Sequence, residues 1–244
     1  MKKIVSIIRR SEQGITRPFQ CRTEDGEAYW CKGLQQNIDG LRREWVCGML
    51  ANELKLPIRE FEALDCPLEL YEEWLRVSGE AGRAHDTFVT DKMHVVFGSK
   101  HVDQINDLRC VEQLIKVADK RALARVLLFD KLIHNTDRTF RNSNILLPMK
   151  NAGSFYLIDH GNAFNCEYAR AEFLNDHIFS LAYAGMKKVE VESLFNDMVS
   201  VVTDELVSRI WHGMPDVWKE TSPREYAISL QEMKIVIKKE RVSL

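Results

Sequence analysis

Short runs of β-compatible residues dominate the beginning of the chain. Residues 2–8 and 17–23 are such runs, and a turn signal at residues 24–27 separates the second run from a third at 28–32. Runs that are joined by short turns tend to pair with their neighbours in the chain. The pattern therefore predicts a small antiparallel meander.

Helical spacing begins after this meander. From Leu41 to Leu54 apolar residues recur at intervals of three or four, and Pro57 ends the predicted helix. The next segments are predicted to form a strand, a short amphipathic helix and another strand, at residues 58–64, 67–77 and 93–97. Gly98–Ser99 is predicted to stop the last of these strands.

Beyond about residue 101 the apolar residues follow helical spacing. The predicted helical stretches are 109–119, 120–134, 173–212 and 226–240. Two short strands interrupt them, at 144–147 and 154–158, joined by a turn at 149–153. A strand-rich first part and a helix-rich second part predict an α+β fold with two lobes, which we place at residues 1–99 and 100–244.

Composition and charge change this picture little. The 244 residues are 45% hydrophobic and 29% charged, as in an ordinary globular protein with a buried core. A net charge of −2 gives no overall attraction to nucleic acid, so we expect no direct nucleic-acid binding. No run of about 18 apolar residues occurs, so no membrane span is expected. The start MKKIVSIIRR is interpreted as a first strand rather than a signal peptide.

The cysteine pattern argues against a zinc or redox motif. No two cysteines form a C-x-x-C pair, and the six are widely scattered. We expect reduced thiols and a cytoplasmic protein. The residues concerned are Cys21, Cys31, Cys47, Cys66, Cys110 and Cys166.

The densest group of reactive side chains lies between a predicted helix and a predicted strand, at His134–Asn142. A loop that is held at both ends is a common place for catalytic groups. Asp159 follows the next apolar strand, FYLI, and precedes His160–Gly161. A carboxylate at the end of a buried strand, followed closely by glycine, is a recurring arrangement for a metal ligand.

These residue types fit phosphoryl transfer. The reaction needs a carboxylate that orients the nucleophile and oxygen ligands that hold magnesium. Asp137 is the candidate base, and Asn142 and Asp159 are the candidate metal ligands. The spacing of an aspartate and an asparagine five positions later is that of the kinase catalytic loop.

The same segments resemble those of a known family. LLFDKLIHNTDRTFRNSNILL and FYLIDHGNAF resemble the HipA-like kinases, a bacterial group with a divergent protein-kinase fold. The resemblance covers roughly residues 10–165. Nearer the N-terminus it includes a phosphate loop, a lysine strand, the start of a glutamate helix and a lobe-joining segment, at QGITRP, YWCK, LRRE and FGSK.

The resemblance implies a two-lobed protein-kinase-like fold, with ATP and Mg²⁺ as cofactors. Lys32 would hold the α- and β-phosphates and pair with Glu44, while Gly14 and Thr16 would cover the phosphates. The adenine would meet the backbone near Gly98, Ser99 and Lys100.

The expected activity is transfer of the ATP γ-phosphoryl group to serine or threonine of a protein substrate. HipA-like kinases are often toxins of toxin–antitoxin systems that act on the translation apparatus, which suggests a partner of that kind by analogy. Two alternatives stay open. The single glycine of QGITRP suggests a catalytically silent binding module with a kinase shape. The motifs also occur in kinases of small molecules and lipid head groups.

Simpler interpretations apply to each feature alone. Lys32 is then an ordinary lysine at the end of a strand, Glu44 a solvated charge, and Asp137 and Arg138 a structural ion pair. His134 is interpreted as a residue that organises the loop rather than as a base. Residues 166–244 carry no motif and are expected to complete the helical lobe.

Overall fold

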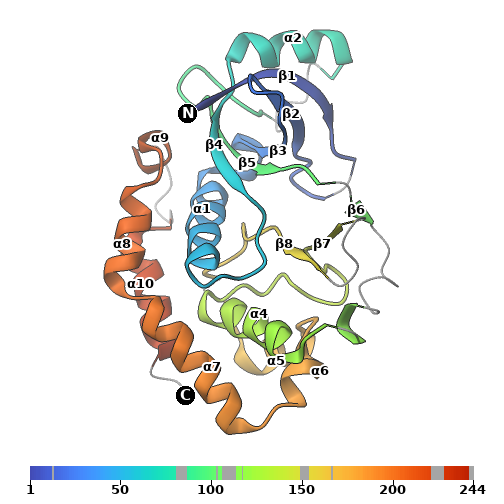
Figure 1. Ribbon diagram of the computed structural model, residues 1–244. Helices are drawn as coiled ribbons and strands as arrows, with labels where there is room; N and C mark the ends of the chain where they lie inside the picture. Colours follow the sequence, from blue (N-terminus) through green and yellow to red (C-terminus); the bar gives the residue numbers. More distant parts are fainter. Residues whose placement is uncertain are drawn as a thin grey trace. The chain divides into compact units, whose positions relative to one another are not determined.

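The chain folds into two compact units in the computed structural model (Figure 1). The first unit contains Met1–Trp45, Arg59–Val102 and Met214–Ala227, and the second contains the rest. The division into lobes at residues 99 and 100 stays a prediction. The structure describes residues 1–12, 14–80, 87–102, 104–105, 114–116, 118–148, 154–165, 167–220 and 228–241.

The first unit is built around a closed barrel of five strands in the order β1-β2-β3-β5-β4. The meander β1–β2–β3 is antiparallel, as predicted, and a parallel pairing of β1 with β4 closes the barrel. Closure leaves no unpaired sheet edge. The strands are β1 (Lys2–Arg10), β2 (Phe19–Thr23), β3 (Ala28–Lys32), β4 (Phe61–Asp65) and β5 (Val95–Lys100).

Alternation of inward and outward residues fills the barrel. In β3, Tyr29 and Cys31 are buried and their neighbours are partly exposed. Phe19 of β2 is fully buried, and its ring lies 4.3 Å from that of Phe88 and 5.1 Å from that of Trp74. Trp74 belongs to α2 (Leu68–Ser78), which Figure 1 shows beside β1. The predicted amphipathic helix at 67–77 is thus confirmed.

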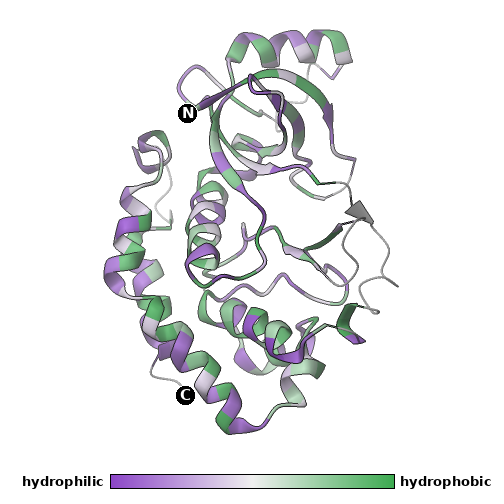
Figure 2. Cartoon of the chain, in the orientation of Figure 1, coloured by the Kyte–Doolittle hydropathy of each residue, from purple (hydrophilic) through white to green (hydrophobic). Residues whose placement is uncertain are grey.

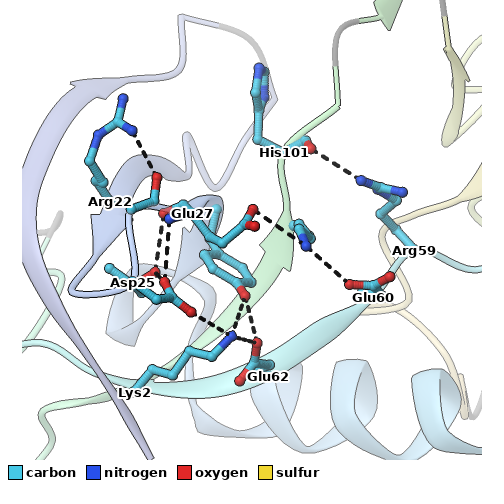
Figure 3. Close-up of polar contacts among 12 residues, drawn as sticks. Lys2, Arg22, Asp25, Glu27, Arg59, Glu60, Glu62 and His101 are labelled. Carbon is cyan, nitrogen blue, oxygen red and sulfur yellow. Dashed lines mark hydrogen bonds and ion pairs between the residues drawn. The ribbon is translucent and has the colours of Figure 1, made fainter. Parts of the chain in front are cut away.

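A surface ion network lies across the seam between β1 and β4. Figure 3 shows Lys2 between Asp25 and Glu62, at 3.1 Å and 2.6 Å. The hydroxyl of Tyr29 donates to Glu62 at 2.5 Å. Hydrogen bonds from Thr23 and Lys2 lower the pKa of Asp25 to about 2. Because the charged side chains of Lys2, Asp25 and Glu62 are each more than one-third exposed, their ion pairs are expected to add little stability.

The end of β5 corrects one prediction. The strand does not stop at Gly98–Ser99; it continues to Lys100. Gly98 pairs with Cys31 on one side and Glu62 on the other. A Cβ atom at Gly98 would collide with the side chain of Leu64, so the glycine permits close packing inside a strand. The prediction was wrong because a glycine that packing requires inside the strand was interpreted as its end.

A short helix that the sequence patterns missed also belongs to the first unit. It is α9 (Asp216–Glu220), and its Trp218 is fully buried. The indole Nε1 donates to the carbonyl of Val95 at 3.0 Å, and the ring lies 6.0 Å from that of Trp45. Arg42 donates through Nε to the carbonyl of Trp218 at 2.7 Å. Both Arg42 and Trp45 lie on α1 (Ile38–Glu53), so α9 fixes this helix.

The second unit is mainly helical. Its α4 (Lys120–Leu132) is buried over most of its length and contacts α6, α7 and α10. Figure 2 shows hydrophobic and hydrophilic residues alternating along α7 and α8. The other helices are α5 (Arg170–Asp176), α6 (Ser180–Ala184), α7 (Lys188–Val201), α8 (Asp204–His212) and α10 (Leu230–Arg241).

A three-stranded sheet in the second unit carries the segments of interest. It consists of β6 (Gln104–Ile105), β7 (Ile145–Pro148) and β8 (Tyr156–Leu157) in that order. The pairing of β7 with β8 confirms the two strands predicted there. Most of the helix predicted at 109–119, and the turn at 149–153, lie outside the described residues.

The architecture confirms the predicted α+β class, with strands early and helices late. The four cysteines that the structure describes, Cys21, Cys31, Cys47 and Cys66, are buried and carry reduced thiols. Burial raises the pKa of the Cys21 and Cys66 thiols, so neither is an activated nucleophile. None of the helices in the described part of the chain is both long and apolar enough to cross a membrane.

Removal of the Trp218 side chain is expected to destabilise the first unit. Trp218→Ala leaves a cavity beside Trp45, and such losses cost about 3–5 kcal/mol. Urea unfolding measures the change in free energy. Glu220→Ala, at an exposed position of the same helix, is the control and is expected to change it by less than about 0.5 kcal/mol. Equal stability of Trp218→Ala and the wild type would contradict the anchoring role of α9.

Candidate active site

The first unit brings together the predicted lysine and glutamate. Lys32 ends β3 and Glu44 lies on α1, and their Nζ and Oε1 atoms are 2.5 Å apart. The side chains are 13% and 3% exposed, so this is a largely buried ion pair. Glu44 is therefore not the solvated charge of the simpler interpretation, and Lys32, although it ends a strand, is held in an ion pair. A buried pair of this kind is costly to break, because the remaining charge is left without compensation.

The predicted phosphate loop joins β1 to β2. Its base is closed by a hydrogen bond from the Ser11 N–H to the carbonyl of Pro18, 2.8 Å long. Gly14 has a φ of +80°, and the space around its missing Cβ is open. The backbone conformation, rather than crowding, therefore favours glycine there. Gly14 is exposed and Thr16 half-buried, while Gln13 lies outside the described residues.

The predicted adenine segment is the second half of β5. Ser99 pairs with Trp30 and Phe61, so its backbone is part of the barrel wall. The ammonium of Lys100 lies 3.3 Å from both Glu60 and Glu27, two residues labelled in Figure 3. These hydrogen bonds raise the pKa of Lys100. The Lys100 side chain is therefore held by surface carboxylates, and the backbone at Gly98 and Ser99 is paired with β3 on one side and β4 on the other.

The second unit places Asp137 in a loop of residues 133–144, between α4 and β7. Its carboxylate accepts hydrogen bonds from three asparagine amides. Nδ2 of Asn142 donates to Oδ1 at 2.9 Å, and the amides of Asn144 and Asn162 donate to Oδ2, each at 3.2 Å. The carboxylate is thus fixed in orientation although it is only half-buried.

The turn that carries Asn142 is held by Thr139. The N–H of Thr139 donates to the carbonyl of Asn142 at 2.9 Å, and Oγ1 of Thr139 accepts from the N–H of Asn142 at 3.2 Å. Because an ionised carboxylate only accepts, the amide nitrogen of Asn142 must face Asp137. Its carbonyl oxygen Oδ1 then points to other partners, and it bonds to none of the described residues.

Asp159 lies in a second loop, residues 158–164, which follows β8. Its φ of +59° is unusual for a residue with a side chain. His134, Asn144 and Phe164, in or beside the two loops, also have positive φ. Such conformations persist where the surroundings enforce them, and they cluster at functional sites. The N–H of Ile158 donates to the carbonyl of Asn144 at 3.1 Å and joins the loops.

A buried network lies beneath both loops. The simple interpretation paired Arg138 with Asp137, but the guanidinium instead bonds to Asp130 of α4 at 2.7 Å. The side chains of both partners are 0% exposed. His177 donates to the same carboxylate at 3.0 Å, and Asn135 donates at 2.9 Å. Burial alone would raise the pKa of Asp130, but the charge of Arg138 and the bond from His177 hold it well below its usual value.

The protonation of His177 follows from its contacts. Its Nδ1 accepts from the N–H of Phe179 at 3.1 Å, so the ring proton lies on Nε2, which donates to Asp130. Burial lowers the pKa of His177, despite the opposing effect of Asp130. The folded protein therefore holds a neutral imidazole.

The start of the first loop is fixed from the C-terminal helix. His134 is buried, and its Nε2 lies 3.0 Å from Oε1 of Glu240 on α10. Its ring stacks on Tyr168, with centroids 4.0 Å apart. These contacts occupy His134 as an organiser of the loop.

Sequence reasoning missed four residues of this region. Asp130, His177 and Glu240 sit on helices or connections without any motif, and only packing brings them to the loop. Asn162 follows Asp-His-Gly directly, and its nearness to that motif was the one available signal.

Asn142 and Asp159 offer oxygen donors, the type of ligand that magnesium prefers. In the described residues no group of three or more His, Cys, Asp or Glu side chains is arranged to hold a metal ion. The carboxylate of Asp159 and the amide oxygen of Asn142 are hard donors. Magnesium commonly takes one or two protein ligands, with water and phosphate completing its coordination.

A family model described as HipA-like kinase matches residues 4–242. This chain belongs to the HipA-like kinase family. The match extends past both ends of the segment 10–165 that carried the sequence resemblance. It includes His177, Trp218 and Glu240, which anchor the candidate site from positions without motifs.

Solved structures agree on the fold. The proinflammatory kinase CtkA of Helicobacter pylori is similar with a TM-score of 0.56 and 9% identity, over 98% of this chain and 94% of that one. A Golgi casein kinase with Mn/ADP bound is similar with a TM-score of 0.52 and 12% identity, over 98% and 72%. No curated protein matches the chain. Family and fold together make this chain a kinase-type phosphotransferase.

His177 is expected to make stability depend on pH. In the unfolded chain this histidine takes up a proton as the pH falls through about 6.5, but the folded protein resists protonation. The free energy of unfolding should therefore decrease as pH falls below about 6.5, and His177→Gln should remove that part of the slope. Urea unfolding between about pH 5 and 7 measures it. The exposed His212→Gln is the control, and parallel slopes for His177→Gln and wild type would contradict the neutral state.

Proposed function

We propose that this kinase transfers the γ-phosphoryl group of ATP to a serine or threonine hydroxyl of a protein. The observation that carries the proposal is the arrangement around Asp137. Its carboxylate is hydrogen bonded to Asn142 within one turn, at the spacing of the kinase catalytic loop. Membership of the HipA-like kinase family supports the same reaction.

Asp137 is proposed to orient the acceptor hydroxyl and to accept its proton. An ionised carboxylate offers about four lone-pair sites. Three asparagine amides take three of them, so one site is left for a donor hydroxyl. The amides also stop the carboxylate from rotating away, which keeps the acceptor oxygen directed at the phosphorus.

Asn142 and Asp159 are proposed to hold Mg²⁺ through Oδ1 of the amide and through the carboxylate. When bound, the ion would offset the negative charge of the phosphates. Asn142 would then have two tasks, because its amide nitrogen holds Asp137 while its carbonyl oxygen would serve as a metal ligand.

The nucleotide is proposed to be bound by residues of the first unit. Lys32 would hold the α- and β-phosphates, with its ammonium positioned by Glu44 at 2.5 Å. The loop that carries Gly14 and Thr16 is proposed to cover the phosphates, and the segment of Gly98, Ser99 and Lys100 is proposed to lie beside the adenine. The Mn/ADP complex of the Golgi casein kinase supports use of nucleotide and divalent metal on this fold.

The acceptor is proposed to be a protein, by analogy with the family. The same analogy suggests a protein of the translation apparatus. Incubation with γ-labelled ATP and Mg²⁺, alone and with cell extract, tests this. Label on proteins supports the proposal, while label on metabolites or lipids indicates the small-molecule alternative. Absence of both nucleotide binding and turnover would indicate a silent kinase-shaped module.

Loss of the proposed base or metal ligand is expected to abolish turnover without unfolding. Asp137→Asn removes the proton acceptor and Asp159→Ala a metal ligand, so initial rates with labelled ATP should fall at least about 10²-fold. Asp176→Asn, an exposed aspartate on α5, is the matched control and should keep the wild-type rate. Full activity of purified Asp159→Ala would refute the assignment.

The ion pair in the first unit permits a test that separates stability from catalysis. Lys32→Met strands the carboxylate of Glu44 at a buried position and should cost about 3 kcal/mol of stability. Adding Glu44→Gln removes the stranded charge, so the double variant should regain most of that loss while ATP turnover stays low. Urea unfolding and steady-state rates measure the two effects.

A purely structural pair would behave differently. The double variant would then recover activity together with stability. That result would remove Lys32 from the proposed nucleotide site.

A further inference from the structure

The guanidinium of Arg138 contacts both loops of the candidate site. Its Nη1 donates to the carbonyl of Asn144, in the first loop. The same atom lies 3.4 Å from the carbonyl of Ile158, and Nη2 lies 3.2 Å from Nε2 of His160. Ile158 and His160 are the two neighbours of Asp159 in the chain.

The direction of the His160 contact follows from the chemistry of arginine. A guanidinium nitrogen can only donate, so Nε2 of His160 accepts. His160 is 1% exposed, and its ring is held away from solvent. The residue that replaces phenylalanine in the usual Asp-Phe-Gly motif thus has a defined partner.

Arg138 is itself held by the carboxylate of Asp130, which has two further partners. Its Nε donates to Oδ2 of Asp130 at 2.7 Å, and His177 donates to the same oxygen at 3.0 Å. Asn135 donates to Oδ1 at 2.9 Å. The carboxylate is therefore bonded through both of its oxygens, and it can keep the guanidinium in one orientation.

A buried ion pair is a poor means of gaining stability. Removing two charges from water is costly, and apolar side chains of similar volume are often no less stable at such positions. The fork of arginine, however, bonds several groups at fixed angles, which neither lysine nor an apolar residue reproduces. The contacts of Arg138 are those of a residue that sets geometry.

We propose that Arg138 is a positioning residue that fixes Asp159 relative to Asp137, and that Asp130 and His177 fix Arg138 in turn. The inference rests on the proposed roles of Asp137 and Asp159. It assigns a function to His177, which lies in a part of the sequence without motifs, and to the histidine of Asp-His-Gly.

Arg138→Lys tests the proposal, since it keeps the charge but loses the fork. We expect kcat to fall about 10²-fold, because misplacing reacting groups by about 1 Å has that effect. The KM for ATP should change less than about threefold, since Lys32 and Glu44 are untouched. The Mg²⁺ concentration for half-maximal rate should rise, because Asp159 is no longer held. Arg121→Lys, at an exposed position of α4, is the control.

Hydrogen exchange gives a readout that does not depend on activity. The amides of Thr139, Ile158 and Phe164 are bonded within or between the two loops in the wild type. Arg138→Lys should speed exchange in peptides covering 136–145 and also in those covering 156–165. His177→Gln alters the side chain that supports Asp130 but keeps the backbone bridge between His177 and Thr139 of the first loop. It should act on the same two peptides and lower kcat about tenfold.

The outcomes are distinct. Faster exchange in both peptides, with the split between kcat and KM, supports the proposal. Exchange changes confined to 136–145, or a wild-type kcat for folded Arg138→Lys, would overturn it. If Arg138→Lys does not fold, the His177→Gln results decide in the same way. If the wild-type protein shows no phosphoryl transfer, the proposed function is refuted. The hydrogen-exchange measurement would still decide whether Arg138 joins the two loops.

Discussion

The buried ion pair of Asp130 and Arg138 is the interaction on which the candidate site of the second unit depends. Both side chains are completely withdrawn from solvent. The cost of burying the charges is offset by bonds to Asn135 and His177 on one side and to loop carbonyls on the other. Because a half-satisfied buried network is unfavourable, these groups hold each other in one arrangement. Arg138 bonds to both loops, so the network also fixes their positions.

In both units, candidate site residues lie on segments that are anchored by contacts with distant parts of the chain. In the first unit, α1 carries Glu44, and Trp218 fixes α1 from more than 170 positions later in the sequence. In the second unit, Glu240 of α10 fixes His134 at the start of the loop that carries Asp137. The part of the chain after residue 166 therefore determines the geometry of residues that precede it.

The departures from common kinase motifs have local physical reasons. The phosphate loop has a single glycine, Gly14, whose φ is +80°, and Arg17 in the same loop also has a positive φ. The histidine in Asp-His-Gly accepts a hydrogen bond from Arg138, a contact that phenylalanine cannot make. A protein that retained only the kinase shape would have little need for a carboxylate held by three amides.

The sequence by itself determined the elements that are local in the chain, and it predicted the candidate site residues. Hydrophobic spacing predicted the meander, α1, α2 and α4, and motif spacing pointed to Asp137, Asn142 and Asp159, because period and spacing depend on near neighbours. Sequence patterns failed where a residue is required by packing. Gly98 was interpreted as the end of a strand, but it lies inside β5, where the side chain of Leu64 leaves no room for a Cβ atom. Only the tertiary structure decided that Arg138 pairs with Asp130 and that His177, Trp218 and Glu240 hold the site. Contacts across long sequence separations are selected by shape and burial, which leave no periodic signal in the chain.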